Sequence, residues 1–194
     1  MLCSTIIDRL ALSCQEMPKT AVAYFYFDFT DIGKRDCAAL VKSLITQLVA
    51  QSEFIPQPLL DLYEAHGNGS NLVDDEDLVT VLRNIILTFH NVYLVLDALD
   101  ESSGCEEVLG LIRTTQQWRL SRLHLLATSR QLASIEESFK DIIDDRICLQ
   151  ESTLNTDIAV YIANQLENDK TLTRWPPDLR KHIQQVLMAE EDGM

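Results

Sequence analysis

The chain has 194 residues, of which 46% are hydrophobic and 24% charged, a composition typical of one folded domain or slightly more. Its 16 basic and 30 acidic residues give a formal net charge of −14, which disfavours non-specific binding to DNA, RNA or anionic membranes. The five cysteines are widely spaced and form no CxxC pair, and no stretch has the ~20 consecutive apolar residues of a membrane span. These features argue against a zinc site and a disulfide framework, and they favour a cytoplasmic protein with reduced thiols.

The first part of the chain alternates between helical and strand patterns. Residues 2–15 have apolar side chains at roughly helical spacing, and Pro18 ends that pattern. The aromatic-rich segment 21–29 is typical of a buried strand. Apolar residues then recur every three or four positions in 37–50, which predicts a helix, and a shorter helix follows at 54–65.

The middle of the chain continues this alternation. The composition HGNGSN predicts a loop at 66–71. A helix is expected at about 74–89, because its leading acids suit the positive end of a helix dipole. A strand at 92–97, a helix at 108–117 and a strand at 123–129 complete the pattern.

The last part of the chain changes character. A short strand is predicted at 146–149, and only helices follow, at 157–166 and 177–188. Strands that alternate with helices indicate an α/β fold with a largely parallel sheet flanked by helices. We therefore expect an α/β core at 1–150 and the start of a helical subdomain at 151–194.

Three carboxylates follow the apolar strand in VYLVLDALDE, residues 92–101: Asp97, Asp100 and Glu101. Open α/β sheets bind ligands at the carboxyl ends of their parallel strands. Asp97, at the last position of the strand, is suited to bind a hard cation directly or through water. Glu101 lies further out, where it would orient a water for attack on a phosphate. This is the Walker B arrangement of nucleotide-hydrolysing proteins.

The same acids also have a purely structural interpretation. Ser102 or Ser103 would cap the helix that follows, and Asp100 and Glu101 would lie in the favourable field of its dipole. An apolar run that ends in an aspartate is common, so this motif alone does not decide between the two.

A second polar strand end occurs in LLATSR, residues 125–130. An arginine at the tip of a strand reaches a phosphate held at the end of the neighbouring strand, which makes Arg130 a candidate phosphate-binding residue. The alternative is a surface arginine that pairs with one of the many acids.

Together these motifs resemble the NACHT class of signal-transduction NTPases, and within it the nephrocystin-type N-terminal domains of large fungal proteins. The resemblance covers about residues 1–190, and it rests on YFYFDF at 24–29, SLITQL at 43–48, the segment DALDE at 97–101, and LLATSR. It implies a P-loop NTPase-like core that binds Mg²⁺ and ATP or GTP, followed by a helical lid. It also implies a switch that joins an effector domain to repeat domains.

The resemblance gives a role to each candidate site residue. Asp97 would hold Mg²⁺, Asp100 and Glu101 would serve hydrolysis, and Arg130 would act as the phosphate sensor. The family's P-loop, GxxxxGK[ST], does not occur in this sequence, whose single Gly-Lys pair is Gly33–Lys34. We therefore expect a fragment that begins just after its P-loop and that binds little or no nucleotide.

The resemblance also implies that an internal strand is missing, between the strands predicted at 123–129 and 146–149. The sheet would close that gap, stay open or borrow a strand from a partner. The rival function is a non-catalytic acidic module for protein interaction. Ser or Cys hydrolase chemistry has little support, because no GxSxG motif is present.

Overall fold

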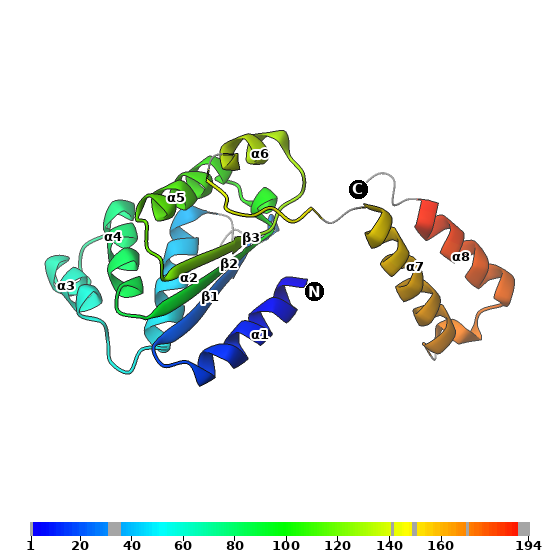
Figure 1. Ribbon diagram of the computed structural model, residues 1–194, viewed down its shortest axis with the longest axis horizontal. Helices are drawn as coiled ribbons and strands as arrows, with labels where there is room; N and C mark the ends of the chain where they lie inside the picture. Colours follow the sequence, from blue (N-terminus) through cyan, green and yellow to red (C-terminus); the bar gives the residue numbers. More distant parts are fainter. Residues whose placement is uncertain (1, 31–35, 141, 149–150, 170, 190–194) are drawn as a thin grey trace. The chain divides into compact units, whose positions relative to one another are not determined.

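The computed structural model describes residues 2–30, 36–140, 142–148, 151–169 and 171–189. The chain divides into two compact units, Met1–Ile143 and Asp144–Met194, which we call the core unit and the C-terminal unit and describe separately (Figure 1). Within the described ranges, every helix is too short or too polar to cross a lipid bilayer.

The core unit is built on a three-stranded parallel sheet. Its strands are β1 (Thr20–Tyr26), β2 (Asn91–Asp97) and β3 (Leu123–Ala127), and β2 lies in the centre. Each parallel connection contains at least one helix, as such crossovers require. The α/β fold with helices flanking a parallel sheet is thus confirmed.

Helices cover both faces of this sheet, but unequally (Figure 1). One face packs against most of the helices, and on the other, within the described part of the core unit, only α1 packs, chiefly over β1 and β2. The helices of the core unit are α1 (Leu2–Glu16), α2 (Cys37–Ala50), α3 (Gln57–Ala65), α4 (Asp75–Ile86), α5 (Cys105–Gln117) and α6 (Ala133–Phe139).

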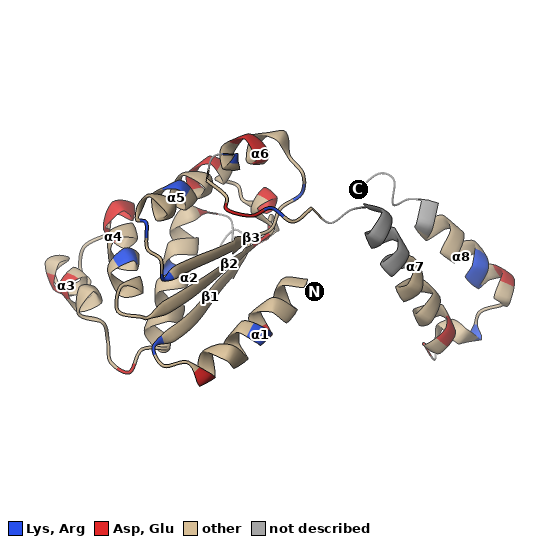
Figure 2. Cartoon of the chain, in the orientation of Figure 1, with Lys and Arg blue, Asp and Glu red and all other residues tan. Residues whose placement is uncertain are grey.

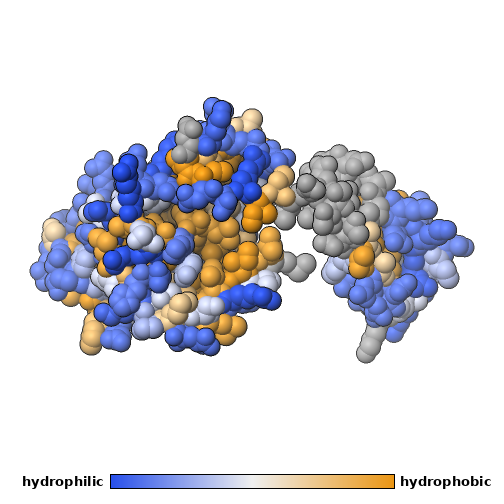
Figure 3. All heavy atoms as spheres, in the orientation of Figure 1, coloured by the Kyte–Doolittle hydropathy of each residue, from blue (hydrophilic) through white to orange (hydrophobic). Residues whose placement is uncertain are grey.

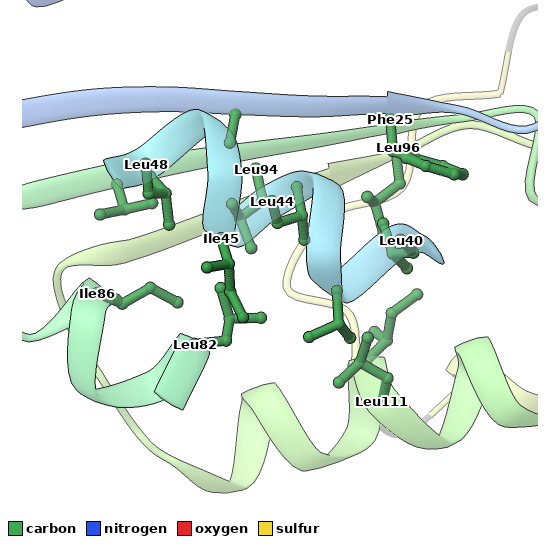
Figure 4. Close-up of a cluster of buried hydrophobic side chains, with 14 of the residues drawn as sticks. Phe25, Leu40, Leu44, Ile45, Leu48, Leu82, Ile86, Leu94, Leu96 and Leu111 are labelled. Carbon is green, nitrogen blue, oxygen red and sulfur yellow. The ribbon is translucent and has the colours of Figure 1, made fainter. Parts of the chain in front are cut away.

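The main hydrophobic core lies between the sheet and α2, α4 and α5 (Figure 4). Leu40, Leu44 and Leu48 recur every four residues along α2, so they form one face of that helix, and none is more than 1% exposed. This face meets Leu94 and Leu96 of the central strand, each 2% exposed. The continuous apolar run of β2 follows from its burial on both sides.

The face under α1 is less complete. Cys3 and Ile7 of α1 bury against Val95 of β2. Leu126 of β3 lies beside Val95 in the sheet register, yet its side chain is 36% exposed. Figure 3 shows the corresponding hydrophobic area at the surface of the core unit, next to α1.

The outer edge of β1 is closed by two glutamine side chains from α2. The Gln51 amide accepts from the N–H of Val22 at 3.1 Å and donates to its C=O at 2.8 Å. The Gln47 amide does the same for Tyr24, at 3.0 and 2.7 Å. These amides take the place of a neighbouring strand, so they satisfy the backbone groups that an edge strand otherwise leaves open.

The structure differs from the sequence-based expectations at two places, of which one is a wrong expectation and the other a helix that was missed. Residues 146–148 are not a strand, and Leu149 lies outside the described residues. No expectation was made for 133–139, which forms helix α6 and buries Ile135 at 3% exposure. The described part of the sheet therefore has one strand fewer than the sequence pattern predicted.

The C-terminal unit is helical, as the sequence predicted for this part of the chain. It contains α7 (Glu151–Asn168), a short 3₁₀ turn at Leu172–Arg174 and α8 (Pro177–Ala189). The carboxylate of Asp169 accepts hydrogen bonds from the N–H groups of Thr171 and Leu172, which lower the pKa of Asp169 and fix the turn between the helices. The assignment of this unit to a lid stays a prediction.

Candidate functional site

The carboxyl ends of β2 and β3 are joined by a network around Thr128. Its hydroxyl donates to Oδ1 of Asp97 at 2.6 Å and accepts from the N–H of Ala98 at 3.1 Å. Ala98 has φ of 58° and ψ of 54°, a left-handed conformation that turns the chain sharply as it leaves the strand. Thr128 thus holds the last carboxylate of β2 and the turn that follows it.

The turn places the next acids at the same end of the sheet. Leu99 begins the 3₁₀ turn Leu99–Glu101, its side chain is 1% exposed, and its N–H donates to the C=O of Thr128 at 2.9 Å. This buried anchor fixes the direction of the turn. Asp100 and Glu101 are therefore presented beyond the strand ends.

Asp100 forms two contacts with Arg130. Its Oδ1 accepts from the backbone N–H of Arg130 at 3.1 Å, and its Oδ2 lies 3.0 Å from the Nε of the same residue. The Asp100 side chain is 8% exposed, whereas that of Arg130 is 70% exposed. The Asp100 carboxylate is therefore buried, whereas most of the Arg130 guanidinium faces solvent.

An open hollow of about 580 Å³ lies at this end of the sheet. Its wall residues are Phe29, Asp100, Glu101, Ser102, Ser103, Arg130 and Leu132. Three of the four residues predicted from the sequence, Asp100, Glu101 and Arg130, line it together. Asp97 is not part of the wall, and it connects to the group through Thr128.

Two contributors were not predicted from the sequence. Thr128 was noted only as part of a polar strand end, and its role appears once β2 and β3 are adjacent. Phe29 was counted in the first strand, but β1 ends at Tyr26 and Phe29 is 60% exposed at the hollow. Asp28 helps to end the strand, because its carboxylate accepts from the N–H and the hydroxyl of Thr30 at 2.8 and 2.6 Å.

The donor set limits which metal the site would suit. Among the described residues, no three His, Cys, Asp or Glu side chains lie close enough together to hold a metal ion. Mg²⁺ is commonly held by one or two carboxylates together with phosphate oxygens and water. Asp97 fits a Mg²⁺ site of this kind, in which phosphate and water supply the remaining ligands. A single carboxylate does not suffice for a site made only of protein ligands.

Cys3 of α1 lies next to this network, with its Sγ 3.9 Å from the Oγ1 of Thr128. Burial, followed by the hydrogen bond and negative charge of Asp97, raises the pKa of the Cys3 thiol from 9.0 to about 11. Burial and the nearby acids Asp75, Glu107 and Asp36 raise the pKa of Cys37 to about 11 as well. Both thiols therefore remain protonated at neutral pH.

We expect alkylation of Cys3 and Cys37 at pH 8 to be about 100-fold slower in the folded chain than in the chain unfolded in urea, because the thiolate is the reactive form. Since folding raises both pKa values, these thiols contribute stability below about pH 9 that is lost as the pH rises towards 11. Mass spectrometry of labelled peptides measures the rates. Equal rates in the two states would contradict the expectation.

The comparison with protein families decides which family this chain represents. The model of the nephrocystin 3 N-terminal family matches residues 1–130. The chain belongs to this family. No curated protein and no solved structure shows a significant match. The nephrocystin 3 N-terminal match includes both strand ends of the site and all four predicted site residues, from Asp97 to Arg130.

Proposed function

We propose that this chain carries the hydrolysis side of a NACHT-type nucleotide switch. One observation carries the proposal: the ends of β2 and β3 bring Asp97, Asp100, Glu101 and Arg130 to a single edge of a parallel sheet. That edge is where open α/β sheets bind ligands.

Each residue has a chemical role in this proposal. The Asp97 carboxylate, held by Thr128, would bind Mg²⁺ directly or through water. Bound Mg²⁺ would neutralise charge on a nucleoside triphosphate, ATP or GTP. Glu101, on the wall of the hollow, would orient a water, with Asp100 supporting that step. Arg130 would contact the phosphate with the exposed part of its guanidinium.

Because Arg130 is already paired with Asp100, it can bind a phosphate only by giving up part of that contact. A phosphate that approaches Arg130 competes with a carboxylate already 3.0 Å away. Anion binding would therefore exchange one partner of Arg130 for another, and the exchange would release Asp100 into the hollow. Such an exchange converts phosphate binding into a local rearrangement.

We expect the 194-residue chain itself to bind ATP or GTP weakly or not at all, because its sequence contains no GxxxxGK[ST] motif. Loss of several hydrogen bonds to charged phosphates, and of the lysine, lowers affinity by on the order of 10³-fold or more. A titration of a fluorescent ATP analogue with Mg²⁺ measures this. A dissociation constant in the micromolar range would refute it.

A second measurement tests the site itself. NMR signals are recorded while Mg²⁺–ATP is raised to about 10 mM, a range in which very weak binding is visible. We expect shifts confined to residues 97–103 and 128–132, and we expect Arg130→Gln to remove them. The matched variant Arg113→Gln, which changes an arginine of α5, should leave them in place.

The rival function is a non-catalytic acidic module that binds protein partners, such as the effector or repeat domains of a larger protein. The bond from Thr128 to Asp97 and the ion pair between Arg130 and Asp100 favour this function, because both carboxylates already have partners within the protein. Absence of any shift up to the same ATP concentration, together with a reproducible protein partner, would support this function instead.

A further inference from the structure

Helices α3 and α4 enclose a second hollow in the core unit, with a volume of about 300 Å³. Much of its wall is apolar and consists of Pro58, Leu62 and Ala65 of α3 and Val81 of α4. Val81 is 5% exposed and Leu62 packs against the main core, so the fold itself holds this apolar wall in place. The hollow shares no residue with the candidate site at the strand ends.

Each of the two helices adds one carboxylate to this wall. Oδ1 of Asp61 accepts a hydrogen bond from Nε2 of Gln57 at 2.8 Å. Oδ2 of Asp77 lies 3.4 Å from Nε2 of His66, and the Asp77 side chain is 50% exposed. The His66 ring is fixed in turn by a 3.0 Å contact between its Nδ1 and the C=O of Leu62. Both carboxylates are therefore held in place by neighbours from their own surroundings.

The wall remains anionic despite these contacts. Oδ2 of Asp61 and Oδ1 of Asp77 have no hydrogen-bond or ion-pair partner among the residues that the structure describes. The wall contains two carboxylates and one imidazole, so its charge is negative whether or not His66 is protonated. Each carboxylate thus keeps one oxygen that is able to accept a further donor.

The sequence around the hollow is strongly acidic. Residues 43–82 contain seven Asp or Glu and no Lys or Arg, so this stretch carries −7 of the net charge of −14. Figure 2 shows the acidic residues of α3 and α4. The helix dipole accounts for the acids in the first turn of α4, but Asp61 lies in the middle of α3, beyond the reach of that effect. Arg83, the only Arg or Lys within these two helices, is not part of the wall.

From these features we propose that the hollow between α3 and α4 binds an arginine side chain from a basic segment of a partner protein. The aliphatic stem of the arginine packs on Leu62, Ala65 and Val81. Its guanidinium pairs with the carboxylates of Asp61 and Asp77. Arginine suits this wall better than lysine, because its planar guanidinium offers five donors and is weakly hydrated. Further basic residues of the segment are attracted by the other acids of 43–82, which steers its approach.

An NMR titration of the full chain with the capped peptide Ala-Arg-Ala-Ala-Arg-Ala tests the proposal. We expect a dissociation constant on the order of 0.1–1 mM at low salt, with shifts confined to residues 58–66 and 77–84. Binding should weaken about tenfold as the ionic strength rises from about 0.05 to 0.5 M. The same peptide with citrulline, which keeps the shape of arginine but has no charge, should not bind. A lysine version should bind several-fold more weakly.

Three variants separate the role of the carboxylates from that of the hollow itself. Asp61→Asn and Asp77→Asn each remove one negative charge from the wall, and each should weaken binding about two- to fivefold. Ala65→Phe fills the hollow from an exposed helical position without changing the charge, and it should weaken binding at least about fivefold. The matched control Glu64→Gln removes a charge from α3 outside the wall and should have a smaller effect than either aspartate variant.

Four results would each overturn the proposal. The first is the absence of any shift up to about 10 mM peptide. The second is a citrulline or lysine peptide that binds as tightly as the arginine peptide. The third is an equal loss of affinity in Glu64→Gln and in the two aspartate variants. The fourth is normal binding by Ala65→Phe.

Discussion

Replacing Gln51 by leucine is expected to lower the free energy of unfolding by about 2–4 kcal/mol. The Gln51 amide satisfies both backbone groups of Val22, a residue only 7% exposed, and it also donates to the C=O of Gln47 at 2.9 Å. Leucine is similar in size but leaves a buried N–H and a buried C=O unpaired, and each such group costs about 1–3 kcal/mol. Urea denaturation followed by circular dichroism measures the change.

Gln47→Leu is the matched control for this experiment. It removes the same two bonds from Tyr24, but Tyr24 is 39% exposed, so water replaces the lost partners. We expect a loss of about 1 kcal/mol or less. If the two variants were equally stable, the explanation based on a buried, unsatisfied backbone would be wrong.

Thr128→Val is expected to destabilise the core unit by about 2–3 kcal/mol, because the hydroxyl serves a carboxylate and a backbone N–H at once. Valine has nearly the same shape and removes only that hydroxyl. The Ala98 N–H would lose its acceptor while its residue remains in a left-handed conformation. Thermal and urea denaturation measure the loss.

Thr128→Ser keeps the hydroxyl and should recover most of the stability. Amide exchange at Ala98 gives a local measurement, because this N–H should lose protection in the valine variant and keep it in the serine variant. A valine variant as stable as the original chain would show that the network around Asp97 contributes little to the fold.

The parts of the fold that the sequence predicted well are those with a strong hydrophobic pattern. The four-residue spacing of Leu40, Leu44 and Leu48 specifies one buried helix face, and the unbroken apolar run before Asp97 specifies a central strand. The segment at 146–149 has only a short apolar pattern, with which a strand and an extended connection are equally compatible. Helix α6 has few apolar positions, and Ile135 is its single buried residue.

The sequence predicted which residues meet at the candidate site, but not which hydrogen bonds they form with one another. The strand ends at Asp97 and Arg130 were placed at one edge because parallel strands share the direction of their carboxyl ends. The partners of those residues depend on side-chain positions across 30 or more residues of sequence, as in the bond from Thr128 to Asp97. The glutamine amides on β1 follow the same rule, because nothing in the sequence of α2 marks them as partners of a strand.

Those glutamine amides also determine how far any assembly through the sheet can extend. A subunit whose sheet has two open edges can associate edge to edge into a filament. A subunit with one open edge can pair only once. In this protein one edge is already occupied by its own α2. The β1 edge is therefore closed to strands of other molecules, which removes one of the two places where separate sheets join edge to edge.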